Sequence, residues 1–282
     1  MNKNVKTGIL GLLLVIPSFL ILFAVVIVPI FLAFVESFKN DSGGYDLSHY
    51  IYIFTDKVMR SNVIYTLKIT VISVILVLAS SYALAVYMRF SSGVMAGWIK
   101  RTYMIPMFIP GVIATYGLIN MYGNHGWLSS FLLLFTDAPL PRIIYDARGI
   151  ILANMWFNIP FTTMLLSSAL SGINNSVIES AKDVGAGRLA IFFRVILPLS
   201  YKTLLVALTF VFMGVIGSFT APFLIGPNAP QMLGVAMEQI FGVYQEEELA
   251  SAVAVFMFLL CSVMGYFYIR TMIKEDKASR SS

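Results

Sequence analysis

The sequence predicts an all-α membrane protein with six helices that cross the bilayer. Of its 282 residues, 59% are hydrophobic and only 12% are charged, whereas soluble domains carry about 25% charged residues. A membrane helix needs about 20 mostly apolar residues, and the apolar runs here are too long and continuous for the short alternating strands of a barrel. The spans are expected at residues 8–35, 62–88, 102–122, 150–170, 203–225 and 249–269.

The distribution of positive charge predicts that both termini lie in the cytoplasm. With the N-terminus inside, 13 of the 19 Lys and Arg residues fall in inner segments, whereas ten of the 14 acidic residues fall outside. Membrane proteins keep Lys and Arg on the cytoplasmic side. The first apolar run follows Lys3 and Lys6 and is too long for the core of a signal peptide, so we expect it to remain as the first span. Residues 1–282 are then expected to form one transmembrane domain.

The chain lacks the residues that most catalytic and metal sites require. Its two histidines, His49 and His125, are far apart, and Cys261 is its one cysteine, so neither a metal cluster nor a catalytic triad is expected. A phosphate-binding loop needs Gly-Lys, a dipeptide that does not occur here. The net charge of +5 is distributed as in a membrane protein rather than a nucleic-acid-binding one. We therefore expect no cofactor in this chain and no enzyme activity of its own.

An ion-coupled secondary transporter is the main alternative from a different class. Such transporters usually bury ionisable residues near the middle of the bilayer. The one clear ionisable residue in the expected spans is Lys68, close to the start of the second span. Its long side chain can reach the membrane surface, and this favours a transporter that is not driven by an ion gradient.

The longest inner connection, residues 171–202, is patterned like folded structure. Ser176 and Glu179 have the spacing of a capping box at a helix start. The glycines within residues 185–187 predict a turn, because glycine adopts a positive φ without steric cost. A second short helix is expected over 188–196. The segment is therefore predicted to be a helix, a turn and a second helix.

One face of the first of these helices is apolar. Val177, Ala181 and Val184 recur at helical spacing, and Pro198 is expected to end the second helix before the fifth span begins. Two interpretations of this face stay open: the helix lies on the membrane surface, or it binds in the groove of a partner protein.

The same segment resembles the EAA loop of binding-protein-dependent ABC importer permeases. That pattern is Glu-Ala-Ala, three residues, Gly, nine residues, Ile, one residue and Leu-Pro. Here Glu179-Ser180-Ala181, Gly185 and Val195-Ile196-Leu197-Pro198 follow it in register, with Ser180 for the middle Ala and Val195 for Ile. The resemblance implies that the segment is a coupling helix seated on an ATPase, through Glu179, Ser180, Ala181, Asp183, Gly185, Ala186 and Pro198.

The resemblance also implies an assembly. It consists of two ATP-binding cassette subunits that hold ATP and Mg, a second permease subunit of different sequence and an extracytoplasmic solute-binding protein. The complex lies in the bacterial cytoplasmic (inner) membrane among its lipids, with no nucleic acid partner. Solute then passes between the two permeases by alternating access.

The solute is the least constrained prediction. The run Gly217–Gly226 resembles the outer end of the fifth span in the spermidine/putrescine branch, and permeases for ferric iron, thiamine and aminophosphonates are similar there, whereas sugar permeases differ. A polyamine is favoured, and another solute of these classes stays an alternative. Hydrogen bonding between helices is the other interpretation of the candidate pathway residues Tyr116, Asn120, Trp156, Asn158, Ser218, Phe219 and Thr220.

Overall fold

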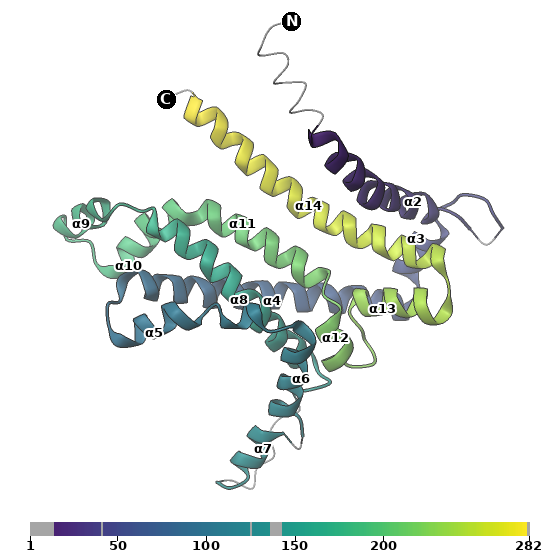
Figure 1. Ribbon diagram of the computed structural model, residues 1–282, viewed down its shortest axis with the longest axis horizontal. Helices are drawn as coiled ribbons and strands as arrows, with labels where there is room; N and C mark the ends of the chain where they lie inside the picture. The colour runs from purple at the N-terminus through teal and green to yellow at the C-terminus, as the bar shows by residue number, and fades with distance from the viewer. Residues whose placement is uncertain (1–13, 41, 125, 136–142, 281–282) are drawn as a thin grey trace, which may run out of the picture. The chain divides into compact units, whose positions relative to one another are not determined.

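A computed structural model describes residues 14–40, 42–124, 126–135 and 143–280, which are helical over most of their length (Figure 1). The named elements are η1 (Phe23–Ile27), α2 (Val28–Glu36), α3 (Ser48–Thr55), α4 (Lys57–Phe90), α5 (Val94–Thr102), η2 (Ile105–Phe108), α6 (Gly111–Tyr122), α7 (Trp127–Leu132), α8 (Ala147–Ser171), α9 (Asn175–Asp183), α10 (Arg188–Ile191), η3 (Phe192–Ile196), α11 (Leu197–Ile216), α12 (Thr220–Ile225), α13 (Leu233–Gln239), η4 (Ile240–Tyr244) and α14 (Glu247–Arg280).

Five helical runs in the described residues are long and apolar enough to cross a membrane. They are Leu14–Glu36, Lys57–Phe90, Ala147–Ser171, Arg188–Ile216 and Glu247–Arg270. A sixth span is completed only if the pair Val94–Phe108 and Gly111–Leu132, bent by 108°, counts as one. The multi-pass helical architecture expected from the sequence is therefore confirmed.

Two of the expected spans differ from the structure. The run expected at 102–122 is broken between η2 and α6, where Pro106 and Pro110 cannot donate backbone hydrogen bonds. The run expected at 203–225 ends at Ile216, and a short helix α12 follows the break at residues 217–219. Apolar composition alone does not register these breaks, because the residues on both sides are equally hydrophobic.

The chain forms two compact units, and each is described by itself. The smaller contains the described residues of Met1–Met59 together with Met237–Phe258. In it, the Ser37 hydroxyl lies 2.7 Å from the Tyr50 hydroxyl, and the rings of Phe54 and Phe256 meet edge to face. Buried Ile53 completes this packing, which connects α3 with the start of α14.

The larger unit contains the described residues of Arg60–Ala236 and Leu259–Ser282, and its core joins α4, α8 and α11 (Figure 1). Lipid is as apolar as a helix surface, so close packing and polar contacts must contribute to holding the helices together. Polar contacts of this kind include Asn154 Nδ2 donating to Ser73 Oγ at 3.2 Å, Ser81 Oγ donating to the Ile159 carbonyl at 3.3 Å, and a 2.6 Å hydrogen bond between Tyr82 and Ser200.

The helical run that enters α11 is continuous through Pro198, so the expectation that this proline ends the preceding helix is wrong. A π-helical turn, η3, comes directly before α11, and the Leu197 N–H donates five residues back to the Phe192 carbonyl. The wider turn accommodates a proline, whose ring would clash with the carbonyl four residues earlier in a regular helix. The same arrangement precedes Pro29, where η1 leads into α2.

Candidate functional site

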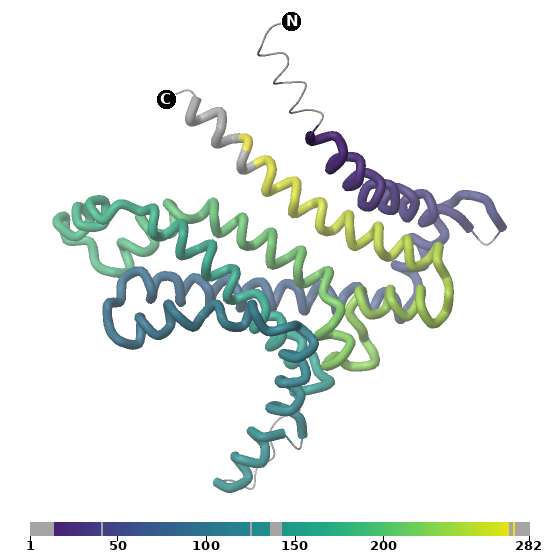
Figure 2. Tube along the Cα trace, viewed as in Figure 1, coloured from purple at the N-terminus to yellow at the C-terminus, as the bar shows by residue number. Residues whose placement is uncertain are grey.

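The segment between α8 and α11 leaves the bundle, turns through α9 and α10 and returns along α11 (Figure 2). Helix α9 is capped by Asn174, whose side-chain oxygen accepts the Ser176 N–H at 3.3 Å. The prediction of a capping box at Ser176 and Glu179 is therefore wrong: the cap of α9 is Asn174, two residues before Ser176. Asn is at least as good a cap as Ser, and Asn174 has the extended backbone that a cap requires.

The inner face of α9 also differs from the expected one. Ile178 is buried and Ala181 packs against the same core, whereas Val177 is 43% exposed and Val184 is 84% exposed. The expected apolar face of Val177, Ala181 and Val184 therefore splits, because Ile178 sets the helix rotation. Glu179, Ser180 and Asp183 are not buried and lie on the outer side.

Gly185 ends α9 in the predicted left-handed conformation, with φ of 80°. The Ala186 N–H donates to the Ala181 carbonyl at 3.0 Å, and the Gly185 N–H donates to the Lys182 carbonyl at 2.8 Å. These two bonds form a Schellman motif, which satisfies carbonyls left free at a helix end. The turn expected from the glycines is confirmed, and it reverses the chain toward α10.

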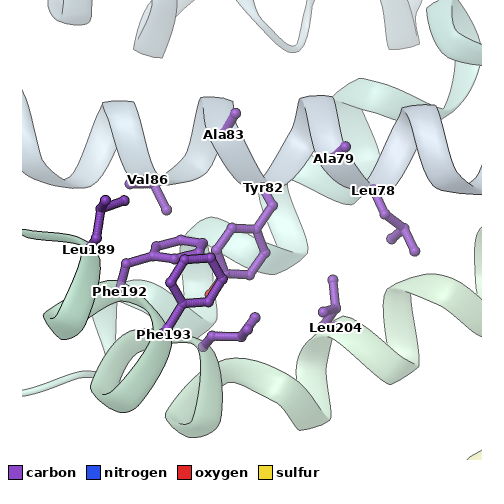
Figure 3. Close-up of a pocket in the computed structure, with 10 residues that line it drawn as sticks. Leu78, Ala79, Tyr82, Ala83, Val86, Leu189, Phe192, Phe193 and Leu204 are labelled. Carbon is purple, nitrogen blue, oxygen red and sulfur yellow. The ribbon is translucent and has the colours of Figure 1, made fainter.

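An apolar cluster fixes this segment to α4 and α8. Its buried members on the segment are Ile173, Ile178, Ile191 and Ile196, and its buried members on the spans are Tyr82, Ala85, Leu166 and Leu170. Beside it, Leu189, Phe192 and Phe193 face α4 across a cavity of about 540 Å³ (Figure 3). The rings of Tyr82 and Phe192 meet edge to face, with centroids 5.6 Å apart. This packing joins α9 and α10 to α4 and α8, and α10 continues through η3 into α11.

Arg89, at the end of α4, holds the start of the segment and was not predicted from the sequence. Its Nε donates to the Leu170 carbonyl at 3.3 Å, and its Nη2 donates to the Ile173 carbonyl at 3.4 Å and to the Asn175 side chain. These carbonyls lie at the end of α8, where backbone acceptors lack helical partners. A basic residue at the end of a span is ordinarily explained by the positive-inside rule, so the sequence carried no separate signal for this contact.

The candidate solute-pathway residues lie on three elements of the larger unit. Tyr116 and Asn120 lie on α6, with Tyr116 52% exposed, and Trp156 is 37% exposed on α8. Asn158 donates to the Asn154 carbonyl at 2.8 Å, which is the intrahelical use of a polar side chain.

The remaining three pathway residues lie at the break between α11 and α12. Ser218 donates to the Val215 carbonyl at 2.7 Å, Phe219 stacks on Phe223, and Thr220 begins α12. Helices α6, α8 and α12 pack through a separate apolar cluster around Leu118, Ala153 and Ala221. The pathway residues are thus carried by neighbouring helices, and their role stays a prediction.

The arrangement of the helices defines the chain as having the fold of an ABC importer permease. It superposes on a solved bacterial ABC transporter involved in the import of the acidic polysaccharide alginate with a TM-score of 0.81, over 96% of this chain and 98% of that one, at 16% identity. The sequence model of the binding-protein-dependent transport system inner membrane components matches residues 81–272. The chain belongs to this family.

Curated relatives align with this chain over shorter stretches than the solved structure does. The spermidine/putrescine transport system permease protein PotB of Haemophilus influenzae is 27% identical over 59% of this chain and 59% of its own length. A probable sulfate transport system permease protein of Prototheca wickerhamii is 31% identical over 45% of this chain and 48% of its own. The chain thus spans less than two thirds of either relative.

Proposed function

We propose that this chain is the permease subunit of an ATP-driven, binding-protein-dependent importer, and that residues 171–202 couple it to a separate ATPase. The observation that carries the proposal is that α9 has one accessible and one buried side. Its outer face is exposed, while Ile178 on its inner face is buried in a cluster with residues of α4 and α8. A protein that grips α9 would therefore act on the membrane helices directly. The family match, which includes this whole segment, supports the same role.

The outer face of α9 suits a protein groove better than a lipid surface. Glu179, Lys182 and Asp183 are exposed on this helix, as are Val177 and Val184, so the accessible part of α9 combines charges of both signs with apolar side chains. A groove that takes an amphipathic helix offers both apolar and polar contacts. Of the proposed coupling residues, Glu179, Ser180 and Asp183 would contact the ATPase, whereas Ala181, Gly185, Ala186 and Pro198 would shape the segment.

The remaining parts of the proposal concern the assembly. Two ATPase subunits would bind ATP and Mg, a second permease of different sequence would complete the pathway, and an extracytoplasmic protein would deliver the solute. Both termini and α9 would lie on the cytoplasmic side of a bacterial inner membrane, as the Lys and Arg distribution favours.

Cross-linking from α9 tests the coupling role. Val184 is the best attachment point because it is 84% exposed, and Cys261 is the one native cysteine. We expect Val184→Cys in a Cys261→Ala background to form a cross-link to the ATPase subunit of the assembled complex. The matched control is Ile178→Cys, which is buried and should give none. Failure of Val184→Cys to capture an ATPase in a complex that retains uptake would refute the coupling role.

We propose a polyamine as the solute, supported by the similarity to the spermidine/putrescine permease. The similarity to a sulfate permease favours an anion instead, and ferric iron, thiamine, an aminophosphonate or a sugar are further alternatives. Uptake of labelled spermidine by vesicles with the complete complex should be reduced by excess unlabelled putrescine but not by sulfate. Reduction of uptake by sulfate and not by putrescine would reject a polyamine as the solute.

A further inference from the structure

Arg89 bonds to three successive parts of the chain at the point where α8 leads into α9. It lies in the last turn of α4. Its acceptors are the Leu170 carbonyl on α8, the Ile173 carbonyl in the linker, and the side chain of Asn175, which is the first residue of α9. They are 81 to 86 residues away along the chain. One side chain of α4 therefore bonds to both ends of the linker that carries α9.

The other contacts of this linker, residues 172–174, do not set the direction of α9. Its backbone bonds are local: the Ile173 N–H donates to the Leu170 carbonyl, and Asn174 caps α9 through the Ser176 N–H. The apolar cluster that buries Ile173 holds the segment close to α4 and α8, but apolar attraction is not directional. Hydrogen bonds from a distant helix supply the direction that these contacts lack.

The geometry of these bonds requires an arginine rather than a positive charge alone. A guanidinium is a planar, rigid fork, whereas the ammonium of a lysine is a compact charge on a flexible stem. Here Nε and Nη2 serve separate acceptors, and the guanidinium carbon lies 5.7 Å from the centroid of the Phe90 ring, whose face also attracts a cation. The positive-inside rule would be satisfied by any basic residue, so it does not account for this arrangement.

We propose that Arg89 is the positioning residue of the coupling segment. It fixes the direction in which α9 leaves α8, so that a force on α9 moves α4 and α8 together with it instead of bending the linker. This inference rests on the coupling role proposed above for residues 171–202. It adds a hydrogen-bonded connection from α4 to the first residue of α9, Asn175.

The first test measures solute uptake per ATP hydrolysed by the assembled complex. The probe is labelled spermidine, or sulfate if the competition described above selects it. We expect both Arg89→Gln and Arg89→Lys to lower this ratio severalfold in complexes that still assemble and hydrolyse ATP, because neither side chain has the fork. Arg101→Gln, which removes an exposed charge at the end of α5, is the control and should behave as the wild type. Normal coupling in Arg89→Lys would show that charge alone suffices and would overturn the proposal.

The acceptor on α9 provides a second test that leaves the basic residues unchanged. Asn175 is exposed, so its replacement should not disturb the core. Asn175→Ala removes the acceptor and should lower the coupling ratio, whereas Asn175→Asp keeps an acceptor oxygen and should preserve it. The double variant Arg89→Gln, Asn175→Ala should be no worse than Arg89→Gln alone, because both changes remove the same bond. Additive losses would show that the two side chains act independently and would overturn the proposal.

Hydrogen exchange of the full chain tests the positioning role without transport. The N–H groups of Ser176 and Val177 both bond to Asn174, so they report on the start of α9. We expect Arg89→Gln to speed their exchange about tenfold, as for the loss of one hydrogen bond to a charged group. Unchanged exchange would overturn the positioning role and leave the importer assignment intact. If exchange responds but Val184→Cys captures no ATPase, the coupling role fails instead.

Discussion

Asp46 shows how a single exposed side chain can hold a loop outside the membrane. Its carboxylate accepts a 2.8 Å hydrogen bond from Asn40 Nδ2 and further bonds from the Ser48 hydroxyl and backbone N–H. The hydrogen bond from Asn40 is the largest cause, and those from Ser48 add to it, in lowering the pKa of Asp46 from 3.8 to about 2. Because these donors favour the charged form, the loop is stabilised when Asp46 is ionised.

The lowered pKa predicts the pH range over which this loop is stable. A carboxyl whose pKa is lower in the folded state contributes stability that is full above its unfolded pKa, near 3.8, and is lost as the pH falls toward 2. Amide exchange of residues 42–48 should therefore speed up, after correction for its intrinsic pH dependence, only below about pH 4. Asp46→Asn should abolish that acid transition. If the amides of residues 42–48 in the wild type already lost their protection from exchange at neutral pH, the prediction would be wrong.

Single residues also explain which local predictions failed. Ser176 and Asn174 both carry capping side chains, and only the path of the chain out of α8 decides that Asn174 has the extended backbone. Val177 and Ile178 are both apolar in the sequence, but Ile178 alone is buried in the cluster that contains Tyr82 and Leu170. Choices between neighbouring residues therefore depend on contacts with α4, which is distant along the chain.

At the scale of elements, the turn between α9 and α10 contains two glycines with different requirements. Gly185 has φ of 80°, a conformation that costs a residue with a side chain about 1–2 kcal/mol. Gly187 has φ of −70° and caps α10, where Ser is a preferred residue. At both glycines, the space that a Cβ would occupy has no other atom within 4 Å, so backbone conformation alone separates them.

The pair therefore provides a matched test of the turn. Gly185→Ser should destabilise the end of α9 by about 1–2 kcal/mol, whereas Gly187→Ser should be neutral or slightly stabilising. Hydrogen exchange of the Ala181–Ala186 backbone measures both effects. If the coupling role holds, Gly185→Ser should also lower uptake per ATP hydrolysed. Equal exchange in the two variants would show that the left-handed turn is not required.

At the scale of the whole molecule, the chain belongs to the family of binding-protein-dependent transport system inner membrane components, and the source of energy for the proposed uptake is the remaining question. Lys68 lies on α4, about three turns after the helix begins at Lys57. Lys68 therefore lies further along the helix than the sequence indicated, because the helix starts earlier than the expected span. Lys68 is exposed, which is compatible with a side chain that reaches the headgroups.

Lys68 therefore tests the ion-coupled alternative. We expect Lys68→Met to leave ATP-dependent uptake within about twofold of the wild type, because a charge outside the core contributes little to binding or stability. Lys57→Met, at the start of the same helix, is the control for general surface effects. Loss of uptake in Lys68→Met with normal assembly would place Lys68 in the solute pathway, and uptake driven by an ion gradient without ATP would support a secondary transporter.

The sequence by itself determined the class of the protein, because hydrophobic run length is set by bilayer thickness and the spacing around Glu179, Gly185 and Pro198 is a local pattern. It also determined the glycine turn, since positive φ is a property of a single residue. Only the tertiary structure decided the rotation of α9, the contacts of Arg89 and the break before α12. Most of these depend on contacts between segments that are distant along the chain, which no local pattern encodes.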